Sequence, residues 1–251
     1  MIIKENMVIT PFQLERTIHI YVPDHLEEDQ RCKVVYMFDG HNLFNDEDAT
    51  YGTSWGIKDY LDYHDEPIII VGIECNHEGN DRLCEFSPYD FNDRVWGKVE
   101  GRGKALTKWI VDELKPTIDA KYPTLIQREN TAIAGSSMGG LMSIYVGMSA
   151  STTFGSAACL SPYLPYVYRR LYREIEKTDV TNTVFYISWG AFECNTHRRL
   201  AKYSEQVLSI ARLLTKKRNF VYPHLYEYQD HSEGAWANET AIWMKEIGFM
   251  G

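Results

Sequence analysis

Ser137 is the residue of this sequence best placed to act as a nucleophile. It is the central residue of the Gly-x-Ser-x-Gly segment 135–139, which follows an apolar extended segment, residues 131–134, and precedes an apolar helical pattern, residues 139–149. A nucleophilic serine needs a tight turn that exposes its hydroxyl, and small flanking residues let the strand and helix approach closely. The neighbouring Ser136 lacks glycines at the same offsets and is expected to be a turn residue. The pattern therefore predicts Ser137 as the nucleophile.

A serine that attacks a carbonyl also needs N–H donors for the oxyanion that forms. The helix that begins just beyond Ser137 directs its free N–H groups and positive dipole end toward that oxyanion, so the Met138 N–H is the expected first donor. The second donor should come from the loop after an earlier central strand. The expected strand 34–38 leads into Asp-Gly-His-Asn at 39–42. We assign the second donor to the backbone of His41.

A serine hydroxyl becomes a good nucleophile when a base removes its proton, and histidine is the usual base. His231 follows the last expected strand and precedes the last expected helix, which places it at the edge of a binding crevice. Other histidines fall within expected strands, in loops or on solvated helix faces: His19, His25, His64, His197 and His224. His231 is therefore the predicted base.

The acid that orients the histidine should follow the strand before the last, because hydrolases of this kind place serine, acid and histidine in that order along the chain. Glu193 follows the expected strand 183–189, with room for a strand and a helix on either side. Asp230 is the alternative. In an extended chain, however, a residue adjacent to His231 points to the opposite side. We favour Glu193 and leave Asp230 open.

Aromatic side chains are frequent in the segments expected to form the rim of the crevice, residues 45–55, 74–96 and 189–196. Trp55, Trp96 and Trp189 are the candidate substrate-binding residues, since aromatic rings stack on sugar faces and phenolic acyl groups. Packing in the core is the competing explanation for such residues.

The segment Glu74-Cys75-Asn76-His77-Glu78 carries side chains that can bind metals. We expect a solvated loop there, without a metal ion. Serine chemistry needs neither a metal nor a cofactor, and none is predicted.

Extended segments alternate with helical patterns along most of the chain. The expected strands are 14–22, 34–38, 67–73, 131–134, 155–160, 183–189 and 220–229. The expected helices are 55–64, 102–115, 139–149, 165–177, 199–215 and 235–247. The second helix should end at Pro116, which cannot continue the hydrogen-bond ladder, and Pro223 should place its strand at a sheet edge or a bulge. This alternation predicts a mostly parallel sheet with helices on both faces, in one domain over residues 1–251.

Composition excludes several classes of protein. The 251 residues carry a formal net charge of −9, which argues against binding nucleic acid through its phosphates. Five cysteines without C-x-x-C spacing suggest neither a disulfide framework nor a zinc ribbon. No apolar run has the length of a signal peptide core or a membrane span, so we expect a cytoplasmic protein without membrane contacts. Homo-oligomerisation remains open.

Five ordered blocks give the chain a family resemblance: YMFDGHNLF (36–44), RLCEFSPY (82–89), GSSMGG (135–140), FGSAACLSP (154–162) and HSEGAW (231–236). They resemble the esterase D, feruloyl esterase and enterochelin esterase family of α/β-hydrolases over nearly the whole chain. The resemblance implies Ser137 as nucleophile, His231 as base and an acid in the loop that holds Glu193. Relatives often have aspartate at the acid position.

The sequence thus predicts a serine esterase that hydrolyses carboxylic esters through an acyl-enzyme. Its expected partner is a small ester with a short or aromatic acyl group, sugar-linked esters included. A siderophore-lactone esterase is the nearest alternative, because it shares the machinery and differs at the rim. An acyltransferase similar to the mycolyl transferases fits less well, and a non-catalytic binding protein on a hydrolase scaffold is the alternative from another class.

Overall fold

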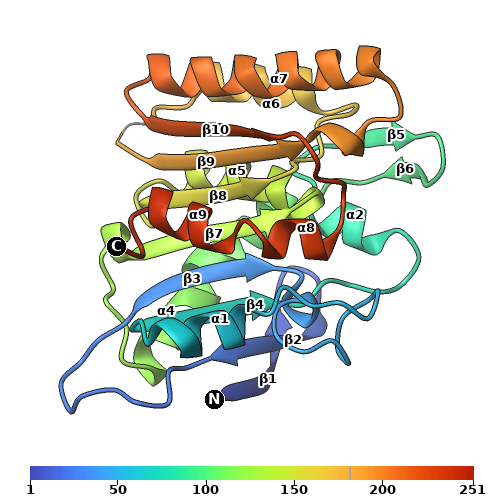
Figure 1. Cartoon of the computed structure of the whole chain (residues 1–251). Helices are drawn as coiled ribbons and strands as arrows, with labels where there is room; N and C mark the ends of the chain where they lie inside the picture. Colours follow the sequence, from blue (N-terminus) through green and yellow to red (C-terminus); the bar gives the residue numbers. More distant parts are fainter. Residues whose placement is uncertain (181) are drawn as a thin grey trace.

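The computed structural model describes residues 1–180 and 182–251, which form a layered α/β structure around one large sheet (Figure 1). The eight strands of this sheet are, in spatial order, β1 (Ile2–Ile9), β2 (Leu14–Tyr21), β4 (Ile68–Ile73), β3 (Lys33–Phe38), β7 (Thr131–Ser136), β8 (Ser156–Leu160), β9 (Val184–Gly190) and β10 (Phe220–Tyr226). The pairs β1–β2 and β2–β4 are antiparallel, and all other neighbours are parallel. The predicted mostly parallel sheet is confirmed.

Each predicted strand has a counterpart in this sheet. The prediction missed β1 at one edge, where the exposed residues Lys4, Asn6 and Val8 alternate with less exposed ones. It also missed a small hairpin formed by β5 (Phe91–Asp93) and β6 (Gly97–Val99). Pro223 lies in β10, the strand at the other edge of the sheet, which pairs with β9, and the predicted edge position is confirmed. Proline is tolerated there because an edge strand needs no second set of N–H donors.

Helices cover both faces of the sheet, as predicted (Figure 1). One face carries α1 (Ile57–His64), α8 (Glu233–Ala237) and α9 (Thr240–Glu246), and the other carries α3 (Gly103–Trp109), α4 (Lys115–Lys121), α5 (Met138–Ser149), α6 (Tyr168–Lys177) and α7 (His197–Lys216). Strand β3 shows how the two cores arise. Val34, Tyr36 and Phe38 pack into one core and Val35 and Met37 into the other, because successive side chains of a strand point to opposite faces.

The helix expected over residues 102–115 continues beyond Pro116, so the predicted end was wrong. It runs from α3 through a π-helical turn, η2 (Ile110–Leu114), into α4, which ends at Lys121. In the π turn the Lys115 N–H donates to the carbonyl of Ile110, five residues back. This shift changes the hydrogen-bond register immediately before Pro116, so the proline enters at the start of α4, where its missing N–H removes no helical bond.

The single helix expected over residues 235–247 is also wrong, because the chain forms two short helices, α8 and α9. Glu239 lies between them, and its carboxylate accepts a 2.7 Å hydrogen bond from the Tyr186 hydroxyl of β9. This buried polar contact ties the junction of the two helices to the sheet. Such a contact depends on tertiary structure and leaves no trace in the helical periodicity of the sequence.

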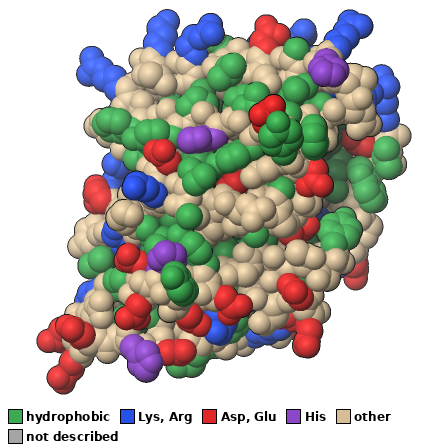
Figure 2. Space-filling model, in the orientation of Figure 1, with side chains coloured by type: hydrophobic (Ala, Val, Ile, Leu, Met, Phe, Trp, Pro, Cys, Tyr) green, Lys and Arg blue, Asp and Glu red, His purple; other side chains and the backbone are tan. Residues whose placement is uncertain are grey.

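Charged side chains of both signs are spread over the face that Figure 2 shows, with lysine and arginine side chains gathered at its upper edge, over α7. Basic side chains are therefore concentrated at one edge of this face. In the described part of the chain, no helix has the length and apolar character needed to cross a membrane.

Candidate active site

Ser137 stands on a strained turn between β7 and α5. Its backbone has φ 57° and ψ −115°, a conformation that residues other than glycine rarely adopt. Gly135 makes the turn possible, because a Cβ at that position would lie 2.9 Å from the carbonyl carbon of Gly139. A strained strand–turn–helix junction of this kind exposes the hydroxyl of a nucleophilic serine. Ser136, expected in the turn, is instead the last residue of β7.

His231 and Glu193 are brought together at the carboxyl ends of β9 and β10. The distance between His231 Nδ1 and Glu193 Oε2 is 2.9 Å. The side chain of His231 is 44% exposed, whereas that of Glu193 is 6% exposed. Glu193 ends the short helix η4 (Ala191–Glu193), which follows β9 directly. A buried carboxylate that contacts one ring nitrogen can hold the other nitrogen as the proton acceptor.

The other oxygen of Glu193 is held by two further donors. The Ser161 hydroxyl donates to Glu193 Oε1 at 2.7 Å, and the Gly190 N–H donates to the same oxygen. The Trp236 indole donates to Ser161 Oγ at 2.9 Å, and its ring also packs edge-on against the His231 ring, with centroids 4.9 Å apart. Glu193 is therefore fixed by a network rather than by one contact.

The sequence interpretation missed Ser161 and Trp236 as parts of this network. Both residues lie in blocks that carry the family resemblance, 154–162 and 231–236, and this position was the available signal. Neither side chain has intrinsic acid–base chemistry near neutral pH, so a search for reactive residue types passes over them.

Asp230, the alternative acid, is exposed and accepts a 2.6 Å hydrogen bond from the Ser232 hydroxyl. Among the described residues, Glu193 is the carboxylate that contacts the His231 ring. The geometry therefore favours Glu193 over Asp230.

Ser137 and His231 both line a cavity of about 580 Å³ at the carboxyl edge of the sheet. The structure records no hydrogen bond between the Ser137 hydroxyl and the His231 ring within the described residues. In enzymes without bound substrate this contact is often long and tightens when the substrate binds. The cavity nevertheless opens onto both side chains, so one bound molecule can reach both.

The two expected oxyanion donors come from different elements, the start of α5 and the short helix that follows β3. Met138 is the first residue of α5, and the first N–H groups of a helix have no partner within it. His41 lies in the short helix η1 (Gly40–Asn42), directly after Asp39, and lines the cavity. A Cβ on Gly40 would lie 2.4 Å from the Gly72 carbonyl oxygen of β4. Glycine at this position lets η1 lie directly on the sheet.

An ion pair anchors the loop that carries His41. The Arg82 guanidinium donates two hydrogen bonds, each 2.7 Å long, to the two carboxylate oxygens of Asp39. Burial opposes the charge on Asp39, but the Arg82 guanidinium outweighs it and lowers the pKa of this carboxyl. The fork-shaped pairing fixes the orientation of both groups.

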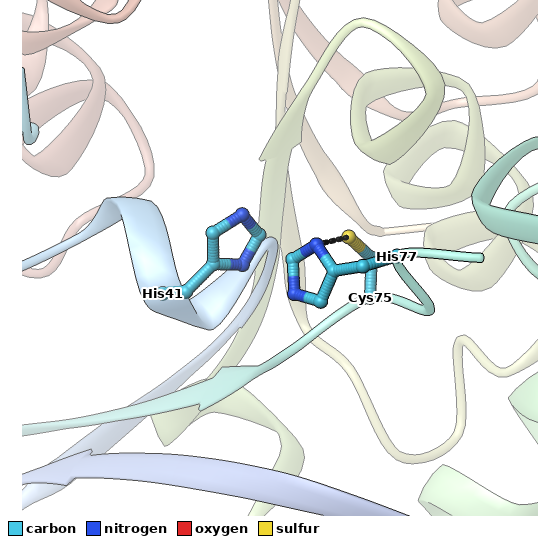
Figure 3. Close-up of side chains that lie close together, drawn as sticks. All are labelled: His41, Cys75 and His77. Atoms are coloured by element: carbon cyan, nitrogen blue, oxygen red, sulfur yellow. Dashed lines mark hydrogen bonds between the residues drawn. The ribbon is translucent and has the colours of Figure 1, made fainter. Parts of the chain in front are cut away.

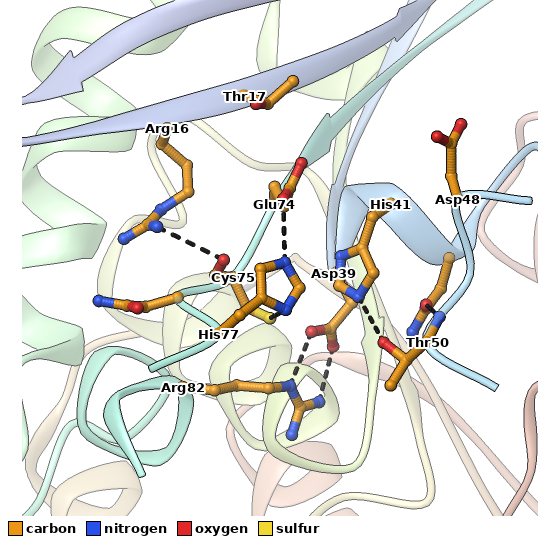
Figure 4. Close-up of polar contacts among 12 residues, drawn as sticks. Arg16, Thr17, Asp39, His41, Asp48, Thr50, Glu74, Cys75, His77 and Arg82 are labelled. Carbon is orange, nitrogen blue, oxygen red and sulfur yellow. Dashed lines mark hydrogen bonds and ion pairs between the residues drawn. The ribbon is translucent and has the colours of Figure 1, made fainter. Parts of the chain in front are cut away.

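The segment that begins at Glu74 is only in part the solvated loop that the sequence predicted, because His77 and Glu78 are exposed. Cys75 and Asn76 are buried, and Figure 4 shows the side chains of Cys75 and His77 next to that of His41. The Glu74 carboxylate lies within hydrogen-bond distance of two histidine rings. Its Oε2 is 2.7 Å from His19 Nε2, and its Oε1 is 2.9 Å from His77 Nε2. The prediction was wrong for Cys75 and Asn76, because the loop folds back against η1.

The three candidate substrate-binding tryptophans have different environments. Trp96 is 53% exposed and lines the cavity. Trp55 is buried and packs against Trp236, and Trp189 is buried with its indole donating to Ser204 Oγ of α7 at 2.8 Å. The expectation of a rim position was wrong for Trp55 and Trp189. Their rings point into the layers between the sheet and its helices.

Comparison with known proteins gives a family and several structural relatives. The family model described as "Putative esterase" matches residues 10–241. No curated protein sequence matches the chain.

Solved structures share the fold at low sequence identity. An IroE-like serine hydrolase from Shewanella oneidensis is 15% identical, with a TM-score of 0.75, over 100% of this chain and 89% of that one. A siderophore hydrolase from Aspergillus nidulans is 15% identical, with a TM-score of 0.72, over 97% and 94% of the two chains. An S-formylglutathione hydrolase from Staphylococcus aureus is 14% identical, with a TM-score of 0.68, over 98% and 96%.

The family match covers most of the chain, and the sheet order, the strained serine turn and the α/β layers agree with it. The predicted resemblance is confirmed: the chain belongs to the esterase family of α/β-hydrolases.

Proposed function

We propose that this protein is a serine esterase that hydrolyses carboxylic esters through an acyl-enzyme. The observation that carries the proposal is the 2.9 Å contact between His231 and the buried carboxylate of Glu193, at a cavity that Ser137 also lines. Contact with the carboxylate keeps the proton on Nδ1 and leaves Nε2 of His231 free to accept one.

In the proposed first step, Ser137 Oγ forms a bond to the ester carbonyl carbon as His231 accepts the hydroxyl proton. The carbonyl oxygen becomes an oxyanion, which the N–H groups of Met138 and His41 stabilise. Collapse of this intermediate breaks the bond to the alcohol oxygen, which takes the proton from His231. Water then attacks the acyl-enzyme with His231 again as base, releasing the acid and restoring Ser137.

The proposed substrates are esters with short or aromatic acyl groups, sugar-linked esters included. The exposed rings of Trp96 and Tyr51 line the cavity together with the indole of Trp236. Aromatic faces pack well against phenolic rings and sugars.

A siderophore-lactone esterase is the second candidate. The names of two structural relatives, the IroE-like hydrolase and the siderophore hydrolase, motivate it. The Arg82 side chain also lines the cavity, and a cation there suits a phenolate or carboxylate on the acyl group.

The test is hydrolysis of p-nitrophenyl acetate by the wild type and by Ser137→Ala, with circular dichroism to verify that both are folded. Turnover in the wild type that disappears in the folded variant supports the proposal. Equal turnover in both would refute Ser137 as nucleophile. If neither is active, an organophosphonate decides: labelling of the wild type but not of Ser137→Ala supports a selective esterase, and no labelling supports a binding protein.

A substrate panel then separates the two candidates. It contains p-nitrophenyl butyrate, methyl ferulate, an acetylated sugar and a catecholate trilactone. Preference for the trilactone, with accumulation of linear catechol products, would identify the siderophore-lactone activity, whereas preference for one of the others would support the first candidate.

A further inference from the structure

Three side chains with soft-metal ligand atoms meet at one wall of the cavity (Figure 3). They are His41 of η1 and Cys75 and His77 of the loop after β4. Their ligand atoms all lie within 4.8 Å of one another, and Cys75 Sγ lies 4.0 Å from His77 Nδ1. The two imidazole rings meet edge-on, with centroids 4.7 Å apart. The esterase mechanism proposed above uses none of these side chains.

The remaining ring nitrogens already have partners. His77 Nε2 lies 2.9 Å from Glu74 Oε1, and His41 Nε2 lies 2.9 Å from Thr50 Oγ1 (Figure 4). Contact with a carboxylate places the His77 proton on Nε2, so Nδ1 presents its lone pair toward Cys75. Metal-binding histidines have such outer partners, which set the tautomer and the ring orientation.

His41 supplies a second, independent indication. Its Nδ1 atom is buried and has no hydrogen-bond partner within residues 1–180 and 182–251, and the whole residue is only 6% exposed. A buried ring nitrogen without a partner is uncommon in folded proteins and calls for an explanation such as an ion.

We propose that His41, Cys75 and His77 bind a zinc-class divalent cation at the cavity wall and that its binding inhibits the esterase. Two imidazoles and one thiolate suit Zn²⁺, which is commonly held by three protein ligands and an open fourth position. On binding, a metal–sulfur bond forms and the Cys75 thiol releases its proton to solvent.

The surroundings are compatible with a cation. The Asp39 and Glu74 carboxylates lie beside the ligands, and Arg82 pairs with Asp39. The ligand atoms must approach one another to reach zinc–ligand bonds of about 2.0–2.3 Å. His77 can make this movement, because its side chain is 54% exposed.

The inhibitory part of this inference rests on the proposed function. His41, Cys75 and His77 line the same cavity as Ser137 and His231, so an ion with an open position would occupy substrate space. The backbone of His41 is also the proposed second oxyanion donor, and a metal on its side chain would restrain that loop.

The experiment measures binding separately from turnover. Chelator-treated wild type is titrated with Zn²⁺ by calorimetry and with Co²⁺ by absorption spectroscopy. We expect one ion per chain, a thiolate-to-cobalt charge-transfer band and affinity at least about tenfold weaker in His77→Ala, because one of three ligands is lost. Cys75→Ser should lose the charge-transfer band. His25→Ala is the control, because His25 is exposed and is not one of the three ligands, and this variant should bind the metal with wild-type affinity.

Binding by His77→Ala with wild-type affinity, or cobalt binding without the thiolate band, would overturn the site. His77→Ala also covers the case in which Cys75→Ser fails to fold, since the His77 side chain is largely exposed. For inhibition, Zn²⁺ should reduce p-nitrophenyl acetate turnover at concentrations that match its Kd, and a chelator should restore it. Full turnover by zinc-loaded protein would refute inhibition. Absence of both p-nitrophenyl acetate turnover and organophosphonate labelling would refute the proposed function and leave the cobalt result decisive for the site.

Discussion

Glu193 Oε2 lies 2.9 Å from His231 Nδ1, although the two residues are 38 positions apart in the chain. The contact joins the carboxyl ends of β9 and β10, which are parallel neighbours in the sheet. Parallel strands bring the segments that follow them to the same edge, so residues distant in sequence meet there.

Glu193→Gln should reduce kcat by about a hundredfold or more, because a neutral amide stabilises the histidine cation poorly and can select the wrong tautomer. Steady-state kinetics on p-nitrophenyl acetate measure the effect. Asp230→Asn is the matched control, since Asp230 is exposed and contacts Ser232. A larger loss in Asp230→Asn than in Glu193→Gln would transfer the role of the acid to Asp230.

Ser137→Ala and His231→Ala should each lower kcat by about a thousandfold or more, and the double variant should lose little beyond either one. The reason is that the hydroxyl and the base act as a unit, so that removing one leaves the other without a function. Single-turnover kinetics of the three variants test this. Losses that multiply in the double variant would show that the two residues act independently.

Arg82→Ala should destabilise the fold by about 3 kcal/mol, because it leaves the buried Asp39 carboxylate without its partner. Urea unfolding measures the change in the free energy of unfolding. The double variant Asp39→Asn with Arg82→Ala should cost less than the sum of the single changes, since asparagine carries no charge and tolerates the left-handed backbone of residue 39. Simple additivity would mean that the pair is not coupled.

Trp96→Ala should raise KM for an aromatic acyl ester about twofold to tenfold, which corresponds to the loss of one ring contact of about 0.5–1.5 kcal/mol. Comparison of methyl ferulate with an acetate ester isolates the aromatic contribution. Tyr63→Ala is the control, because Tyr63 is exposed and is not among the residues that line the cavity. The same KM change in both variants would argue against a substrate contact at Trp96.

Glu239→Gln should make stability less dependent on pH. Burial raises the pKa of Glu239 from 4.5 to about 7. Well below pH 4.5 the carboxyl is protonated in both the folded and the unfolded state. As pH rises toward 7 the unfolded chain loses the proton first and the folded state loses stability, by up to about 3 kcal/mol.

Glutamine keeps an acceptor for the Tyr186 hydroxyl without the titration, so the variant should be more stable than the wild type above pH 7, with the difference shrinking toward pH 4.5. Urea unfolding of both proteins across this pH range provides the measurement. A stability difference independent of pH would contradict the raised pKa.

The sequence alone predicted the alternation of strands and helices, the sheet class and the serine turn. Each of these depends on local patterns, namely apolar periodicity, glycine at defined offsets and the order of elements along the chain. The segment 135–139 needed no tertiary information, because the two glycines and the adjacent strand and helix already define the turn around Ser137.

Tertiary structure decided which side chains face the cavity. Trp55 and Trp189 are buried while Trp96 is exposed, and composition cannot separate them because strand register and helix packing set the direction of each ring. The same packing brings Glu193 to His231 and gathers Cys75 and His77 against His41. In each case the segments that meet are distant in the chain, so their proximity follows from the order of strands in the sheet, which local periodicity does not encode.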